Sequence, residues 1–225
     1  MNVLQIVPEL NAGGVERTTL EMVEALTNAG HRAHVASAGG RMEAELEALG
    51  GRLHKFDVGS KNPLKYLANR KTLIEIIKEY DIDIVHARSR APAWPSYAAA
   101  KAANRPFVTT YHGVYNANSA LKRGYNAIMT KGALTIANSL FTKAHIIAEH
   151  GLNPERIRVI PRAVDMDVFD LGALHPRQIE AQFKHWGVPL DLTLILLPGR
   201  LTRWKGQLTA IEALSRLPET YALIC

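Results

Sequence analysis

Cysteine and long hydrophobic runs are nearly absent from the 225-residue sequence. Its one cysteine is Cys225, and because a disulfide needs two, none can form within the chain. No stretch approaches the ~18 consecutive apolar residues of a membrane-spanning helix, and Pro8 and Glu9 interrupt the first apolar residues before they reach the length of a signal-peptide core. These absences predict a cytoplasmic protein that is neither secreted nor embedded in a bilayer.

Patterns for nucleic-acid binding are also lacking. The sequence has no zinc-finger spacing, no RNP-type motif and no basic-zipper region, although Lys and Arg outnumber Asp and Glu by 27 to 21. The resulting net charge of +6 favours anionic partners such as nucleotide phosphates or an acidic membrane surface. We therefore expect no nucleic acid among the partners.

What the sequence does contain is a regular alternation of two patterns. Short β-branched runs alternate with longer helical segments, as in βαβ units whose parallel sheet is buried on both faces. This alternation predicts an α/β fold with one doubly wound domain of about seven strands. The expected strands are 3–7, 33–37, 53–58, 82–86, 107–111, 133–137 and 157–160, and the expected helices are 15–29, 41–49, 63–80, 92–103, 119–131 and one that runs from the N-cap Ser139 to residue 150.

A break in this alternation indicates the domain organisation. We expect a first domain over 1–170, an interdomain link over 171–189 and part of a second domain over 190–225. The link includes a helical stretch around 178–186.

The last part of the sequence repeats the strand–helix–strand pattern once. We expect a buried, strongly apolar strand over 192–197, a helix over 206–217 and a strand over 221–224. One such unit cannot cover both faces of its own sheet, so we expect the sequence to be a piece of a longer protein.

Two adjacent glycines, Gly13 and Gly14, lie between the first expected strand and the first expected helix. This is the carboxyl edge of the sheet, where open α/β proteins bind ligands. Glycine lets the backbone approach an anion, and the N–H groups at the helix start point toward it. The alternative is a tight turn that needs glycine for its geometry alone. The spacing is not G-x-G-x-x-G, which disfavours NAD binding.

Two cations, Arg200 and Lys205, lie in the expected strand-to-helix junction near the end of the sequence. Arg presents a planar fork and Lys a point charge near a helix N-terminus, a combination suited to a diphosphate and to the charge that grows on a leaving group. The alternative is a solvated basic loop.

A histidine, His112, ends the expected strand 107–111 and is followed by Gly113. At the carboxyl end of a strand it can donate or accept a hydrogen bond at a reacting group. The alternative is a histidine with a purely structural hydrogen bond.

Five segments, in order along the chain, resemble the retaining glycosyltransferases of the GT-B fold, the group known as glycosyltransferase family 4 or glycosyl transferases group 1. The segments are 13–16, 111–113, 137–139, 159–165 and 199–206. The resemblance covers essentially the whole chain. It implies a Rossmann-like N-terminal domain on the acceptor side, followed by a truncated second Rossmann-like domain that binds the nucleotide-sugar.

The resemblance also implies an activity, namely transfer of a sugar from a nucleotide-sugar to a glycan, lipid or small-molecule acceptor, as in lipopolysaccharide or exopolysaccharide synthesis. Arg200, Lys205, Gly13 and Gly14 would bind the donor, and His112 would be the catalytic contact to the transferred sugar. Enzymes of this group use cationic side chains in place of a metal, so the resemblance implies no metal and no cofactor. The histidines at positions 31 and 34 are then interpreted as ordinary surface residues.

The sequence departs from the family pattern in two places. Arg162 and Ala163 stand where the family commonly has Asn-Gly. The acidic E-x7-E segment that typically holds the donor would lie beyond Cys225, so we expect the chain alone to be nearly inactive.

Two other functions stay open at this point, a nucleotide-sugar 2-epimerase of the same architecture and a non-catalytic module that binds the acceptor or a partner. Peripheral contact with an anionic membrane is a further expectation, because Leu121, Tyr125, Ile128 and Met129 fall on one face of the expected helix 119–131. The alternative, which we favour, is that this face packs against the domain's own core.

Overall fold

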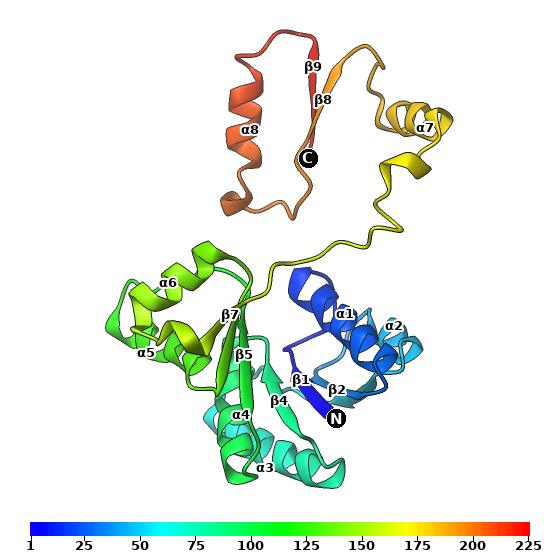
Figure 1. Ribbon diagram of the computed structural model, residues 1–225. Coiled ribbons are helices and arrows are strands. Elements are labelled where there is room, and N and C mark those ends of the chain that lie inside the picture. Colours follow the sequence, from blue (N-terminus) through cyan, green and yellow to red (C-terminus); the bar gives the residue numbers. More distant parts are fainter. The chain divides into compact units, whose positions relative to one another are not determined.

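The computed structural model describes the backbone of residues 1–225 and every side chain except that of Leu171. The chain forms two compact units, Met1–Ala163 and Val164–Cys225 (Figure 1). The sequence indicated a first domain that extends to residue 170 and a link over 171–189. In the structure the span 171–189 contains helix α7 (Pro176–Trp186), at the place where the sequence predicted a helical stretch.

The first unit is built on a sheet of seven strands in the order β3-β2-β1-β4-β5-β6-β7. Every neighbouring pair is parallel, as the alternation predicted. The order reverses between β1 and β4, which is where doubly wound sheets open a crevice at their carboxyl edge. The strands are β1 (Asn2–Ile6), β2 (Arg32–Ser37), β3 (Arg52–Lys55), β4 (Ile84–Ala87), β5 (Phe107–Tyr111), β6 (Leu134–Ala137) and β7 (Ile157–Val159).

Helices cover both faces of this sheet, so the doubly wound α/β prediction is confirmed (Figure 1). On one face α1 and α2 pack Leu20, Val23 and Leu46 against Val35. On the other face α3 and α4 pack residues such as Leu73 against the strands. The helices are α1 (Gly14–Asn28), α2 (Glu43–Ala48), α3 (Pro63–Glu79), α4 (Arg90–Ala102), α5 (Ala120–Asn126), α6 (Leu140–His150) and the short 3-10 turns η1 (Ala127–Thr130) and η2 (Pro154–Arg156).

The predicted single helix over 119–131 is wrong, because the chain changes from α5 to the 3-10 turn η1 at Ala127. The carbonyl oxygen of Met129 accepts hydrogen bonds from the hydroxyls of Thr109 and Thr135, and these strand side chains draw the turn onto the sheet. Ile128 and Met129 are consequently buried in the core. Half of the face considered for membrane contact therefore packs inside the protein, as the favoured alternative predicted.

The second unit is a two-stranded parallel sheet, β8 (Thr193–Leu196) and β9 (Tyr221–Ile224), with α8 (Gln207–Leu214) between the strands in sequence. The prediction that β8 is buried is wrong. Leu196 is 52% exposed, and Leu208 on α8 is 71% exposed. The reason is that two strands packed with α8 alone have too few layers to enclose an apolar strand. The unit also contains α7 and the 3-10 turns η3 (Leu171–Ala173) and η4 (Arg203–Lys205).

Candidate functional site

A cleft of about 200 Å³ opens at the carboxyl edge of the first unit's sheet. Its walls come from α1, from the ends of β4, β5 and β6, and from the segment that follows β7. Because each strand delivers the residue after its carboxyl end to the same edge, side chains far apart in sequence meet here. We call it the His112 cleft, after the residue that sequence analysis placed at this edge.

His112 follows β5 directly, and its backbone carbonyl accepts a hydrogen bond from Asn138 Nδ2 at 3.2 Å. Asn138 is in turn held by the hydroxyl of Thr142, whose backbone N–H is capped by Ser139 at the start of α6. The predicted N-cap is thus confirmed. The 137–139 segment serves to fix the position of His112.

The imidazole of His112 is a neutral hydrogen-bond donor at physiological pH. Burial lowers its pKa to about 3, and the positive charges of Arg88 and Arg162 add to the effect. Arg162 Nη2 lies 3.1 Å from Nδ1, and since a guanidinium only donates, Nδ1 accepts and the proton resides on Nε2. Nε2 is buried and has no partner among the described side chains. The ring therefore holds an unused N–H donor.

Arg88, which follows β4, is the buried cation of the cleft and was missed by sequence analysis. It is 5% exposed, and Nη1 donates to Gln5 Oε1 at 2.6 Å on the neighbouring strand. Burial lowers its pKa to about 10, with a further contribution from Arg162, so the side chain stays charged at neutral pH. Its Nε has no partner in the described part of the chain. A buried charge with a free donor is costly for stability and is typical of functional sites.

Arg162 also joins the glycine turn to His112. Its guanidinium lies where a Cβ on Gly14 would be, so the absence of a side chain at Gly14 permits this arrangement of Arg162. Gly13 precedes α1 with φ of +143°, a conformation that favours glycine. No side chain caps the first N–H groups of α1, so their partial positive charge is available to an anion. Both readings of the turn, tight geometry and an anion-facing loop, fit these contacts.

The structure therefore brings three sequence-predicted residues, Gly13, Gly14 and His112, to one edge of one unit. Arg162 had been noted only as a departure from the family pattern. The signal that would have found Arg88 is its place directly after β4, which is the same positional argument that selected His112.

The other two predicted residues, Arg200 and Lys205, lie in the second unit. Lys205 ends η4, Gly206 follows with φ of +83°, and α8 begins at Gln207, whose side-chain amide donates to the Arg200 carbonyl at 3.1 Å. The Lys205 ammonium lies 4.6 Å from the centroid of the Trp204 ring. Among the described side chains neither cation forms an ion pair. Their role in donor binding stays a prediction.

The interpretation of His34 as a surface residue is wrong. It is 4% exposed, and its Nδ1 lies 3.0 Å from Nε2 of His54 on the adjacent strand. Burial, followed by the charges of neighbouring His54 and Arg52, lowers the pKa of His34 to about 4. No group of three or more potential metal-ligating side chains occurs among the residues that the structure describes. None of the helices described has the length and apolar character needed to cross a bilayer.

Comparison with known proteins places the chain in a family. Residues 12–168 match the family described as Glycosyltransferase Family 4. The glycosyltransferase of Rickettsia africae ESF-5 is 44% identical, with a TM-score of 0.84 over 96% of this chain and 57% of that one. Anabaena HepE, in complex with UDP and glucose, is 22% identical, with a TM-score of 0.83 over 99% of this chain and 60% of that one.

A curated relative, the D-inositol 3-phosphate glycosyltransferase of Xylanimonas cellulosilytica, is 25% identical over 155 residues, which are 63% of this chain and 37% of the relative. The chain thus spans about three fifths or less of the length of these proteins. The family match covers well over half of the chain, and the sheet has the Rossmann-like form that GT-B enzymes share. The chain belongs to glycosyltransferase family 4.

Proposed function

We propose that the protein carrying this chain transfers a sugar from a nucleotide-sugar donor to an acceptor, with retention of anomeric configuration, and that His112 contacts the transferred sugar. The observation that carries this proposal is the unused, buried Nε2–H of His112 in a cleft with two arginines. This N–H group has no hydrogen-bond acceptor, and the oxygen of a sugar hydroxyl can supply one. UDP bound to the similar HepE supports a nucleotide-sugar as the donor class.

The geometry favours a hydrogen-bonding role for His112 over a proton-accepting one. Nδ1 is occupied by Arg162, and with a pKa of about 3 the neutral ring does not take up a second proton at neutral pH. A neutral donor can hold the transferred sugar in the orientation that its transfer requires. This assignment makes His112 a catalytic contact rather than a general base.

For donor binding we propose groups of partial or full positive charge in each unit. Gly13, Gly14 and the uncapped N-terminus of α1 supply backbone N–H groups, and Arg200 with Lys205 supplies side-chain charge. Protein cations at these positions offset the leaving-group charge, and we infer that neither a metal nor a cofactor takes part.

We propose a glycan, lipid-linked or small-molecule acceptor, within a pathway such as lipopolysaccharide or exopolysaccharide synthesis. The net charge of +6 supports a role in the cytoplasm with peripheral contact at the inner face of an anionic membrane, and no nucleic acid is required.

The test uses the gene that encodes this chain, expressed to its natural stop codon, with a panel of UDP-sugars. In His112→Ala we expect kcat to fall on the order of 10²-fold with a smaller change in UDP affinity, because the lost bond orients the transferred sugar and does not contact the nucleotide. The matched control is Phe141→Ala, which removes a 73% exposed ring on α6 outside the cleft.

Three outcomes would contradict the proposal. If turnover is unchanged in His112→Ala, the histidine has no catalytic role. Conversion of the donor in the absence of any acceptor identifies a nucleotide-sugar 2-epimerase instead, and binding of an acceptor with no turnover identifies a non-catalytic module.

A further inference from the structure

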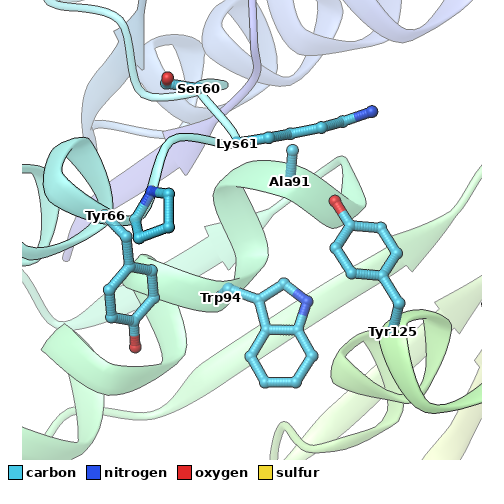
Figure 2. A pocket seen from close by; sticks show the side chains of 7 residues that line it. Ser60, Lys61, Tyr66, Ala91, Trp94 and Tyr125 are labelled. Atoms are coloured by element: carbon cyan, nitrogen blue, oxygen red, sulfur yellow. The ribbon is translucent and has the colours of Figure 1, made fainter. Parts of the chain in front are cut away.

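A second cleft in the first unit, of about 340 Å³, has an aromatic lining that the reaction at His112 does not use. Tyr66 comes from α3, Trp94 from α4 and Tyr125 from α5, and Lys61 and Pro63 complete one side. Figure 2 shows Trp94 between the two tyrosines, with the Tyr125 hydroxyl directed toward Ala91 and Lys61. We call this the Trp94 cleft.

The Trp94 cleft opens at the same sheet edge as the His112 cleft. Its walls are the segments that follow the carboxyl ends of β3, β4 and β5. The connection from β4 to α4 contributes to both clefts, since Arg88 lines one and Ala91, three residues later, lines the other. The two clefts therefore share this connection, although no residue lines both of them.

The aromatic rings are held in place before any ligand arrives. The rings of Trp94 and Tyr125 are stacked with an interplanar angle of 28° and a centroid separation of 6.2 Å. The Arg90 guanidinium lies 4.2 Å from the centroid of the Tyr115 ring and donates to Asn126 Oδ1 at 2.7 Å, which ties α4 to the end of α5. Fixed rings cost little entropy on binding, which favours recognition of a weakly held ligand.

The chemistry of the lining matches a sugar ring. A pyranose has faces of C–H groups and a rim of hydroxyls, and Trp and Tyr likewise combine an apolar face with a polar tip. Trp94 is 37% exposed and lines the cleft, so part of its side chain is accessible to a ligand. Burial raises the pKa of the Tyr125 hydroxyl, so this group stays protonated and can donate. The volume lies near the lower end of the ~300–1,000 Å³ range of ligand pockets, which suits a small carbohydrate.

Charge in the Trp94 cleft also favours a polar ligand over a lipid chain. Lys61 is exposed at the rim, and within the described residues it has no ion-pair partner. An ammonium group at the mouth of an apolar slot would oppose entry of a hydrocarbon but can donate to ring hydroxyls.

We propose that the Trp94 cleft binds a pyranose ring of the acceptor, stacked on Trp94, and so makes the acceptor a glycosylated molecule. This inference rests on the proposed function, because it assigns the acceptor of the transfer proposed to occur at His112. The specificity of the protein for its acceptor then depends on Trp94 and Tyr125.

The experiment labels the chain with 5-fluorotryptophan, which places one ¹⁹F signal in the first unit at Trp94 and two in the second at Trp186 and Trp204. The probes are the methyl glycosides of D-glucose, D-galactose, D-mannose, N-acetyl-D-glucosamine and L-rhamnose. We expect at least one glycoside to shift the Trp94 signal saturably while the other two signals stay in place. Absence of such a shift for every glycoside overturns the proposal.

Variants separate stacking from general loss of structure. Saturation-transfer NMR of the bound glycoside should show affinity falling on the order of tenfold in Trp94→Ala and largely restored in Trp94→Phe, because Phe keeps an aromatic face. The matched control is again Phe141→Ala, with affinity unchanged. Equal affinity in Trp94→Ala and the unaltered chain overturns the proposal.

The two proposals fail in distinguishable ways. If the full gene product turns over a UDP-sugar and no glycoside contacts Trp94, the Trp94 cleft is not the acceptor site and the proposed function stands. If a glycoside binds at Trp94 and no nucleotide-sugar is turned over, the saccharide site stands and the transferase function does not.

Discussion

The two units of the chain follow the same local rule and reach opposite degrees of burial. In both units a parallel strand is followed by a helix and the next strand. In Met1–Ala163 seven strands are covered on both faces, and residues such as Leu4 and Leu73 are fully buried. In Val164–Cys225 two strands and α8, the helix between them in sequence, leave Leu196 and Leu208 largely exposed. The burial of an apolar residue thus depends on how many layers of secondary structure surround it, because one strand–helix–strand pattern by itself does not exclude solvent.

The largest expected effect comes from removing core volume in the first unit. Leu73→Ala should lower the free energy of unfolding of Met1–Ala163 by about 2–5 kcal/mol, since Leu73 is fully buried between α3 and the sheet. The matched change, Leu208→Ala at a 71% exposed position, should alter stability by less than about 0.5 kcal/mol. Urea unfolding followed by ¹⁹F signals from each unit measures both. If both substitutions lowered the free energy of unfolding equally, the two units would not differ in burial as described.

A smaller effect is expected from backbone strain at the glycine turn. Gly13→Ala should cost about 1–3 kcal/mol, because φ of +143° lies in a region that is nearly restricted to glycine. Gly124→Ala, in the middle of α5 with no atom near its added Cβ, should instead stabilise by up to about 1 kcal/mol. Urea midpoints of the two variants test the opposite signs. A stabilised Gly13→Ala protein would show that the turn adopts another conformation.

Acid should destabilise the first unit through His34. Its pKa is about 4 in the folded chain and near 6.5 when unfolded, so between these values the unfolded chain binds more protons. Stability is therefore lost as the pH falls from about 6.5 to about 4, and fully present above that window. His34→Gln should make this loss shallower in urea titrations at pH 7 and pH 5. If the loss of stability between pH 7 and pH 5 is the same in His34→Gln as in the unaltered chain, another titrating group causes it.

The smallest change in stability is expected at Arg88, although it is among the most buried polar residues. Arg88→Met removes a desolvated charge and one bond to Gln5, and these terms oppose each other, so unfolding should change by about 1 kcal/mol or less. Turnover of the full gene product should fall at least about tenfold, because the cleft loses its buried cation. Severe destabilisation with normal turnover of the remaining folded protein would make Arg88 structural.

Much of the first unit could be predicted from sequence because its signals are local. Apolar periodicity and turn residues located the strands to within a few residues, and the positions directly after strands selected His112 and the glycine turn. The same argument would have selected Arg88, but the residue carries no motif. The mistaken helix over 119–131 has a nonlocal cause, since hydroxyls of Thr109 and Thr135 capture the Met129 carbonyl.

The sequence by itself determined the element order, the parallel α/β class and the edge of the sheet at which Gly13, Gly14 and His112 gather. Tertiary structure alone decided that His34 is buried, that Arg162 binds the ring of His112 and overlies Gly14, and that three aromatic residues from three helices line one cleft. The physical reason is the separation in sequence of the residues that interact. Hydrogen-bonded turns and helical faces are specified by neighbours a few positions away, whereas burial, pKa shifts and clefts arise from side chains that meet only after the sheet has formed.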